Sequence, residues 1–422
     1  MPEQAPRLQG ACDALGCMVI HWTRGVGYDA SAKRPMPRVT VVHMNYLDGG
    51  YVSGGALGVL IHALEALQDV ARVRLVTNDA GLDDVARWVA AGNDAYGTSV
   101  RADELEVGIL APLRRRFQRV PKVKTLELHG LRQIQLLHAH RTLDDTDVWF
   151  STTGEMAGQG RWVQYVHYPL HASVKYGHSE WLARLLTGRR LRDGLTHRSL
   201  ANSQWTKDVC ERVGIHDLTV VYPPVVAPNP VDLVPWEERA SDLVCMGRMV
   251  RSKRIEVMLE VARRLHDAGT IQRFHVVGPE ENVAYAASLR DQVAAMAGED
   301  WVVMHGALSR TDVGRLLGSV RYGIHAQVNE HFGMAPAEML RAGCIPFVHD
   351  SGGQVEVVAR EAALRFTNVE DAAEKVQAVA SDPAMAEQLR RTLERQGERF
   401  SEDRFAEEIR GELERALRTA RA

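Results

Sequence analysis

The sequence lacks any run of eighteen apolar residues, and its 422 residues include five cysteines. A helix that crosses a bilayer needs about 20 consecutive, mostly apolar residues, so none is predicted. An odd number of scattered cysteines argues against a disulfide framework, and none of them has the close pairing or the histidine partners of a zinc site. We therefore expect reduced thiols in a cytoplasmic protein.

A strong charge of either sign is also missing. The formal net charge of -3 gives no general reason to expect binding to nucleic acid or to a membrane. The first residues lack the basic segment and the long apolar core of a signal peptide. The G-x-G-x-x-G fingerprint of dinucleotide-binding domains is absent as well. With 45% hydrophobic and 25% charged residues, the composition is that of an ordinary soluble globular protein.

What the sequence does contain is an alternation of strand and helix patterns. Short apolar runs occur at 38–43, 73–77, 147–151 and 163–167, and again at 242–246, 274–277, 301–304 and 322–326. Amphipathic patterns between these runs predict helices, such as those over 58–67 and from Ile255. Such alternation predicts an α/β protein with parallel sheets that are covered by helices on both faces.

The expected domain boundary lies in a segment with four prolines, between Val220 and Pro230. Proline restricts the backbone and interrupts helices and strand ladders, as an interdomain hinge requires. We expect an N-terminal domain over 38–228, a C-terminal domain over 229–400 and a final helix over 401–422. Residues 1–37 show no clear period, so either they form a disordered or loosely packed leader or the true start is Met36.

The most informative segment is Asn329–Glu338, which sets Glu330 and Glu338 eight positions apart. The patterns around it predict a strand, a loop that carries Glu330, and a helix from Met334 that contains Glu338. The first amides of a helix have no intrahelical partner and carry the positive end of its dipole. The arrangement suits an activated sugar, with one carboxylate for sugar hydroxyls, amides for a phosphate and a second carboxylate for a ribose. Two solvated glutamates at a helix start are the alternative.

Two cations follow the predicted strand 242–246. Arg248 comes two residues after its end, behind Gly247, and Lys253 lies five residues further on. Such cations can grip a diphosphate and stabilise the charge that it gains on leaving. The alternative is a basic loop, 248–254, that lies in solvent.

Glycines stand at several predicted turns next to strand ends. They allow the backbone to come close to a phosphate, a sugar or a base, although a turn without a ligand would explain them equally well. The candidates are Gly54, Gly55, Gly247 and Gly278.

His167 ends the predicted strand 163–167, and the following Tyr168-Pro169 turns the chain away. A histidine at the carboxyl end of a strand faces the edge of the sheet where ligands bind. A buried, hydrogen-bonded core histidine is the alternative reading.

These motifs resemble the retaining glycosyltransferases of the GT-B class that carry an E-x7-E signature (glycosyl transferases group 1, GT4-like). Within that class, the sequences of the motifs are similar to those of the α-1,2-mannosyltransferases that extend lipid-linked oligosaccharides. The segments that carry this closer likeness are Tyr165–Pro169, Asn202–Thr206, Val221–Pro224 and Asn329–Gly333 with its continuation Ile345–Gly353. In register they span most of residues 39–410.

The resemblance implies two Rossmann-like, doubly wound domains that face a central cleft, with the C-terminal helix crossing back to the first domain. It implies transfer of a hexose, with mannose from GDP-mannose favoured, to a glycan or lipid-linked acceptor with retained configuration. It assigns Arg248 and Lys253 to the diphosphate, Glu330 to the sugar and His167 to the C6 side of that sugar. The other donor contacts that it implies are Glu338 and the backbone of Phe332, Gly333, Met334 and Ala335.

We expect no metal cofactor, since the two cations and the helix dipole can neutralise the diphosphate. The acidic run Asp144–Asp147 resembles the metal-binding motif of the other glycosyltransferase fold but is interpreted as a solvated turn. One alternative function is the same fold with a UDP-sugar donor and a small-molecule or polysaccharide acceptor. A nucleotide-sugar epimerase and a non-catalytic sugar-nucleotide binder are further alternatives.

Basic residues outnumber acidic ones by eight to one between Leu110 and Arg141, and apolar residues are interleaved with them. Such a face on the acceptor domain, over 114–141, can dock on anionic lipid at the inner face of a membrane and reach a lipid-linked acceptor. The alternative is a solvated helical face whose apolar stripe is buried.

Overall fold

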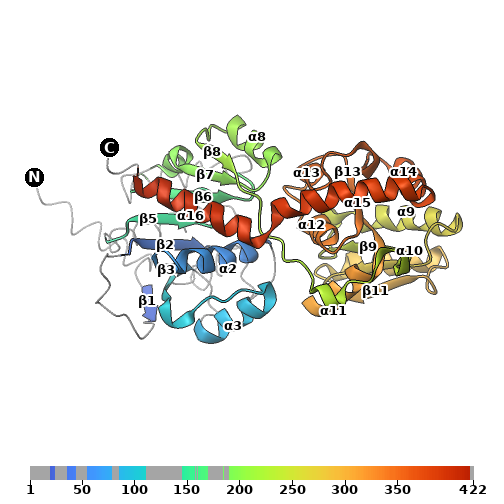
Figure 1. Cartoon of the computed structure of the whole chain (residues 1–422), viewed down its shortest axis with the longest axis horizontal. Helices are drawn as coiled ribbons and strands as arrows, with labels where there is room; N and C mark the ends of the chain where they lie inside the picture. The colour runs from blue at the N-terminus through green and yellow to red at the C-terminus, as the bar shows by residue number, and fades with distance from the viewer. Residues whose placement is uncertain are drawn as a thin grey trace, which may run out of the picture. The chain divides into compact units, whose positions relative to one another are not determined.

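The structure is a computed structural model that describes residues 20–23, 36–43, 55–77, 85–110, 145–156, 158, 160–169, 184 and 190–418. The chain divides into two compact units. The first comprises residues 1–202, 206–223 and 403–422, and the second comprises 203–205 and 224–402. The divisions therefore fall inside the proline-rich segment and at the start of the last helix (Figure 1).

The first unit is built on an eight-stranded sheet ordered β1-β4-β3-β2-β5-β6-β7-β8. Neighbouring strands are parallel, except that β1 runs antiparallel to β4. The strands are β1 (Ile20–Thr23), β2 (Arg38–His43), β3 (Arg72–Thr77), β4 (Glu106–Leu110), β5 (Val148–Ser151), β6 (Trp162–Val166), β7 (Arg198–Ala201) and β8 (Leu218–Val220). Its helices include α2 (Gly55–Gln68), α3 (Val85–Tyr96), most of α8 (Gln204–Arg212) and nearly all of α16 (Glu402–Arg418).

The second unit is built on a six-stranded, fully parallel sheet ordered β11-β10-β9-β12-β13-β14. Its strands are β9 (Ala240–Met246), β10 (Phe274–Val277), β11 (Val302–Gly306), β12 (Val320–His325), β13 (Ile345–His349) and β14 (Arg365–Phe366). Its helices are α9 (Ile255–Asp267), α10 (Val283–Ala295), α11 (Arg310–Ser319), α12 (Met334–Arg341), α13 (Gln354–Val357), α14 (Val369–Ser381) and α15 (Pro383–Gly397).

Both sheets share one strand order. When the parallel strands of each sheet are numbered along the chain, six of them lie side by side in the order 3-2-1-4-5-6. This is the Rossmann arrangement. The prediction of two Rossmann-like parallel sheets is confirmed. The strand order reverses between β2 and β5 in the first unit and between β9 and β12 in the second. Ligands of open α/β sheets bind at the carboxyl ends of the strands at such a point.

Within the predicted leader, Ile20–Thr23 forms β1, which pairs with β4 at the edge of the first sheet. This strand lies inside the segment over 1–37, for which the sequence predicted either a disordered or loosely packed leader or a true start at Met36. Its hydrogen-bond partner lies some 85 residues away in the chain, a long-range pairing to which no local period points.

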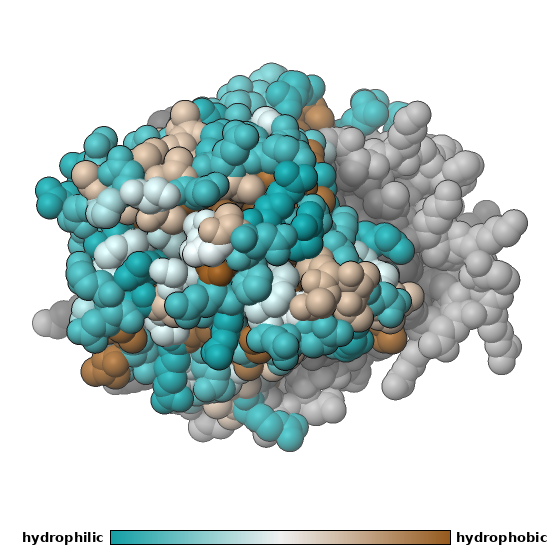
Figure 2. All heavy atoms as spheres, turned by 90° about the vertical axis from the view of Figure 1, so that its right-hand side faces the viewer, coloured by the Kyte–Doolittle hydropathy of each residue, from teal (hydrophilic) through white to brown (hydrophobic). Residues whose placement is uncertain are grey.

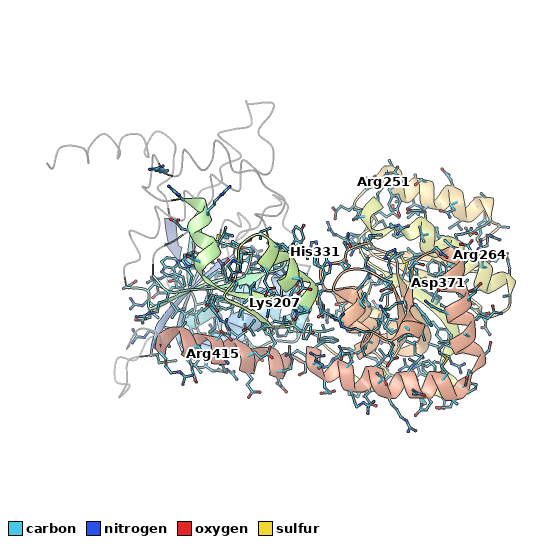
Figure 3. The ribbon with its side chains drawn as sticks, turned by 90° about the horizontal axis from the view of Figure 1, so that it is seen from above. Lys207, Arg251, Arg264, His331, Asp371 and Arg415 are labelled. Carbon is cyan, nitrogen blue, oxygen red and sulfur yellow. The ribbon has the colours of Figure 1, made fainter. Side chains whose placement is uncertain are left out.

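The helices of the second unit bury one face each. On α9 the buried residues recur every three or four positions, as an amphipathic helix requires: Ile255, Met258, Leu259, Val261, Ala262 and Leu265. The helices α9 and α14 pack together, and Figure 3 labels Arg264 of α9 and Asp371 of α14 close to each other. The outer face in Figure 2 is mostly hydrophilic with scattered apolar residues, as is usual for a protein surface.

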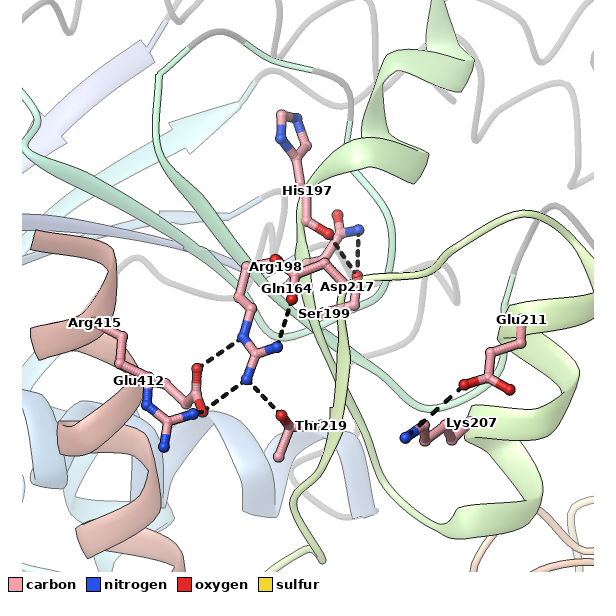
Figure 4. A network of polar contacts seen from close by, with 10 residues as sticks. All are labelled: Gln164, His197, Arg198, Ser199, Lys207, Glu211, Asp217, Thr219, Glu412 and Arg415. Atoms are coloured by element: carbon pink, nitrogen blue, oxygen red, sulfur yellow. Dashed lines mark hydrogen bonds and ion pairs between the residues drawn. The ribbon is translucent and has the colours of Figure 1, made fainter. Parts of the chain in front are cut away.

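The last helix completes the core of the first unit. Phe405, Ile409 and Leu413 of α16 recur every four residues and join the buried cluster of α2 and the neighbouring strands. Next to them, the Glu412 carboxylate accepts hydrogen bonds from Arg198 of β7 at 2.9 and 3.0 Å and from Arg415 at 3.0 Å (Figure 4). A buried carboxylate between two guanidinium groups therefore ties the helix to the sheet.

Replacing Glu412 with glutamine is expected to destabilise the first unit. The Glu412 side chain is only 5% exposed, and its loss leaves the partly buried Arg198 with Asp217 as its remaining charged partner. Breaking a buried pair in this way costs about 3 kcal/mol. The control is Glu414→Gln, since Glu414 is 67% exposed and pairs along the helix with Arg418. Urea unfolding should show a lower midpoint for Glu412→Gln alone, and equal midpoints would contradict the assignment.

Candidate active site

Three side chains meet where the strand order of the second sheet reverses. Lys253 ends the short turn Arg251–Lys253 after β9, His325 is the last residue of β12, and Glu330 lies in the loop that follows β12. Lys253 Nζ lies 2.8 Å from Glu330 Oε2 and 3.5 Å from His325 Nε2. The exposed fractions of the side chains are 19% for Lys253, 15% for Glu330 and 1% for His325. The structure thus brings the two predicted residues together and adds His325.

The loop that carries Glu330 leads into α12 through two left-handed residues, Asn329 (φ 54°) and Gly333 (φ 105°). Gly333 is the N-cap of α12, and no side chain caps the helix. The first bond within the helix runs from Ala337 N to Gly333 O, so the amides of Met334 and Ala335 lie at the positive end of the helix dipole. The predicted helix start is confirmed, and these amides remain the predicted phosphate contacts.

Phe332 has a structural role that its motif did not reveal. Its side chain is 2% exposed and packs edge-to-face on Phe400, with 5.3 Å between the ring centroids. A buried ring cannot face a ligand, so only the backbone of Phe332 stays a candidate contact.

A second loop holds the first in place through backbone contacts. Gly353 N donates to Glu330 O at 2.7 Å, and a Cβ on Gly352 would lie 2.2 Å from that same oxygen. A Cβ on Gly353 would lie 2.1 Å from His331 O. Only glycine fits at either position, so the pair after β13 sets the path of the Glu330 loop. Site prediction from the sequence missed these residues, although the Gly-Gly pair after the apolar run 345–348 was the available signal.

The charges of Lys253 and Glu330 stabilise each other. Burial acts to raise the pKa of Glu330, but the ammonium group of Lys253 outweighs it and holds that pKa below its ordinary value. Burial and the positive charge of Lys253 together lower the pKa of His325 to about 4, although Glu330 and Gln354 oppose the change. At neutral pH the site therefore holds an ammonium, a carboxylate and an uncharged imidazole.

Acid is expected to weaken the second unit through His325. The group titrates at 6.5 when unfolded and at about 4 when folded, so between these values only the unfolded chain binds the proton. The contribution of neutral His325 to the free energy of unfolding is complete above pH 6.5. It is lost as the pH falls toward 4, and the total loss is about 3 kcal/mol. Urea unfolding from pH 7 to 4.5 should show a shallower pH slope for His325→Gln than for the parent protein. Equal slopes would contradict the burial of a neutral ring.

Arg248 points to a different partner. Its Nη1 lies 2.8 Å from both carboxylate oxygens of Glu281, and its side chain is half-exposed. A diphosphate would have to share or replace Glu281 as the partner of Arg248. The predicted role of Arg248 remains a prediction.

The glycines at the ends of β9 and β10 have a packing reason. Gly247 and Gly278 adopt φ values of 148° and 144°, and a Cβ on Gly278 would lie 1.9 Å from Gly247 O. The two backbones touch, so no larger residue fits at Gly278 even without a ligand. Donor binding by these glycines remains a prediction.

Glu338 lies in α12, where its Oε1 is 3.6 Å from Arg310 Nη1. Burial raises the pKa of Glu338, and Arg310 opposes the change. A carboxylate with this environment can accept hydrogen bonds from ribose hydroxyls, which is the role predicted for it.

In the first unit, His167 directly follows β6, the second strand beyond the reversal between β2 and β5. Its Nε2 is 3.0 Å from Thr152 O, so this nitrogen carries the proton and donates. His43, the last residue of β2, bonds Thr152 Oγ1 through Nδ1 at 2.8 Å. Burial and the nearby His167 together lower the pKa of His43 to about 3. Site prediction missed His43, although its position at the end of the first predicted strand was the available signal.

Of the two remaining glycine candidates, Gly55 is the first residue of α2, which begins three residues before the predicted helix 58–67. Gly54 lies outside the described residues. The basic segment 114–141 also lies outside them.

The described part of the acidic run, Asp145 and Asp147, lies before β5 at the amino ends of the strands, opposite the carboxyl ends where ligands bind. Asp145 pairs with Arg38 and Arg74, and Asp147 Oδ2 accepts from Arg38 N at 2.8 Å. The interpretation as a simple solvated turn was incomplete, because these carboxylates hold the starts of β2 and β3.

Within the residues that the structure describes, no three His, Cys, Asp or Glu side chains gather as metal ligands would. In the same part of the chain, no helix has the length and apolar character needed to cross a bilayer.

Comparison with known proteins agrees with this geometry. The family model described as glycosyl transferases group 1 matches residues 234–398, which contain Arg248, Lys253, Glu330 and Glu338. Residues 234–398 are a glycosyl transferases group 1 domain. This domain corresponds to the sheet of the second unit, with the Lys253–Glu330 pair at its reversal point.

Two curated relatives carry the name GDP-Man:Man(3)GlcNAc(2)-PP-Dol alpha-1,2-mannosyltransferase. The protein of Dictyostelium discoideum is 24% identical over 229 residues, which is 50% of this chain and 45% of the relative. The protein of Neurospora crassa is 25% identical over 252 residues, which is 52% of this chain and 45% of the relative. Each match thus spans less than half of the length of the relative.

Solved structures share the fold of the whole chain at low identity. Sucrose-phosphate synthase from Thermosynechococcus elongatus has a TM-score of 0.64 at 15% identity, with 91% of this chain and 100% of that chain covered. Anabaena Alr3699/HepE in complex with UDP has a TM-score of 0.63 at 15% identity, with 89% of this chain and 99% of that chain covered. The GT-B fold, with two Rossmann-like α/β domains, is therefore that of this chain.

Proposed function

We propose that this protein is a retaining glycosyltransferase that moves mannose from GDP-mannose to a hydroxyl group of a glycan or lipid-linked acceptor. The observation that carries the proposal is the pair of Lys253 and Glu330, 2.8 Å apart at the reversal point of a group 1 domain. The donor and the acceptor are inferred from the names of the curated relatives.

In the proposed reaction, Glu330 orients the sugar through its hydroxyl groups, and Lys253 faces the diphosphate. The bond between the anomeric carbon and the diphosphate oxygen breaks, and the acceptor hydroxyl forms a new bond on the same face. The hydroxyl proton passes to a phosphate oxygen, so no side chain is needed as a base. His167 contacts the C6 side of the sugar in this scheme.

We propose that the negative charge of the leaving diphosphate is matched by protein groups in place of a metal ion. Lys253 and Arg248 supply two positive charges, and the amides of Met334 and Ala335 add the positive end of the α12 dipole. Glu338 would accept from the ribose. Glu281 is the group that a diphosphate must displace to reach Arg248.

The acceptor side is proposed from the sequence of the first unit. A lipid-linked acceptor requires contact with a membrane, and the basic segment 114–141 has the composition to dock on anionic lipid at its cytoplasmic face. Peripheral binding should therefore weaken as salt rises, since exposed charges are screened.

Thermal stabilisation by nucleotides tests the donor assignment first. A ligand that binds only the folded protein raises the melting temperature. GDP, UDP and ADP are compared in the presence of a chelator, and GDP is expected to give the largest shift. A larger shift with UDP would replace the GDP-sugar by a UDP-sugar, and a shift that needs added metal would overturn metal independence. Retention is then tested by NMR of the product formed from GDP-mannose.

A further inference from the structure

His325 and Gln354 form a chain of hydrogen bonds that ends at Lys253. Gln354 begins α13 and is fully buried. Its Nε2 donates to three backbone oxygens, those of Gln327 at 2.7 Å, His349 at 3.1 Å and Ser351 at 3.1 Å. Carbonyl oxygens only accept, so the amide nitrogen must face them. The orientation of the Gln354 side chain is therefore fixed, with its oxygen on the other side.

That oxygen determines the tautomer of His325. Gln354 Oε1 lies 2.7 Å from His325 Nδ1, and an amide oxygen can only accept, so Nδ1 carries a proton. A second proton on Nε2 would point at the Lys253 ammonium group 3.5 Å away. The ring therefore stays neutral and presents the lone pair of Nε2 to Lys253.

Lys253 has two protein partners for three ammonium protons among the described residues. Glu330 Oε2 accepts a hydrogen bond from the ammonium group at 2.8 Å. His325 Nε2 accepts a second one at 3.5 Å, the outer limit of a hydrogen bond. With two protons fixed from different directions, the direction of the third is fixed as well. Glu330 alone would leave the ammonium group free to rotate about one ion pair.

We propose that His325 and Gln354 are positioning residues, which aim the third proton of Lys253 at the departing diphosphate. Glu330 uses one oxygen for Lys253, and its second oxygen accepts from His331 N at 3.0 Å. Each carboxylate oxygen can accept a second hydrogen bond, which leaves room for a sugar hydroxyl. The catalytic consequence rests on the proposed function, whereas the tautomer of His325 does not.

Matched variants of His325 separate positioning from mere packing. In His325→Gln the amide oxygen reaches the place of Nε2 and can accept from Lys253. In His325→Asn the shorter amide reaches only the place of Nδ1 and keeps the bond to Gln354. We expect kcat with GDP-mannose to fall about tenfold in His325→Asn and to stay within threefold in His325→Gln, with KM nearly unchanged in both. Equal losses of kcat, in proportion to lost melting temperature, would overturn the positioning role.

The tautomer is measured directly, without any assay of activity. Nitrogen NMR of protein labelled with 15N-histidine distinguishes Nδ1–H, Nε2–H and the doubly protonated ring, and the His325 signals are those missing from His325→Gln. Nδ1–H at pH 7 is expected, and either other form would overturn the proposal. If no nucleotide binds and no hexose is transferred, the proposed function fails, while the NMR result still decides the hydrogen-bond chain.

Discussion

Glu330→Gln is expected to lower kcat for hexose transfer by about 1,000-fold, while the protein stays folded. The substitution keeps the shape of the side chain but removes the charge that pairs with Lys253 at 2.8 Å. It also weakens the hydrogen bonds that a carboxylate would accept from sugar hydroxyls, since bonds to charged acceptors are stronger than those to neutral ones. Transfer to acceptor, followed by release of nucleotide, is the measurement.

Nucleotide binding should respond differently in the same variant. A diphosphate and the Glu330 carboxylate repel each other, so affinity for GDP should be unchanged or higher after the charge is removed. The matched control is Glu370→Gln, because Glu370 is 59% exposed and pairs with Arg264 on the surface. Near-normal turnover in Glu330→Gln would show that the site has been assigned wrongly.

Lys253→Ala is expected to lower kcat by about 100-fold and to weaken GDP binding by about tenfold, because a charge-assisted hydrogen bond contributes roughly 1.5–3 kcal/mol. The larger effect on kcat follows because the diphosphate gains negative charge as it leaves, so the ammonium group binds the transition state more tightly than the ground state. Binding of guanosine, which has no phosphate, should not change. Steady-state kinetics and calorimetry with GDP and guanosine measure the three quantities.

The control for this variant is Lys375→Ala. Lys375 pairs with Asp371 four residues earlier on the surface of α14 and lies away from the reversal point of the sheet. If Lys253→Ala lost affinity for guanosine and GDP alike while kcat stayed normal, Lys253 would be a binding residue without a role in departure of the diphosphate.

Much of the second unit could be predicted from local sequence. The strand over 274–277 and the helix start at Met334 were predicted at the observed residues, since both depend on the period of apolar residues over one short window. The Glu330 loop and its glycine were found in the same way. The strand predicted over 301–304 is instead β11, Val302–Gly306, because its carboxyl end is set by pairing with β10.

Residues that act through distant partners were not found. His325 reads as one more member of a buried strand until Gln354 and Lys253 are placed on either side of it. Arg248 was predicted as a cation that grips the diphosphate, which stays a prediction, and its pairing with Glu281 depends on how β9 and β10 lie beside each other. The same is true of Gly278, whose neighbour Gly247 comes from the adjacent strand.

By itself, the sequence determined the α/β class, the alternation of strands and helices along part of the chain, and which residues carry charge near the ends of the predicted strands. These properties depend on covalent neighbours and on the repeat of apolar residues, both of which are local. Only the tertiary structure decided that Lys253, His325 and Glu330 meet, and that Gly352 and Gly353 hold the Glu330 loop. The physical reason is that the hydrogen bonds of a sheet and the packing of loops at its strand ends join segments far apart in the chain, such as Lys253 with Glu330 or β2 with β5, and no local pattern encodes that pairing.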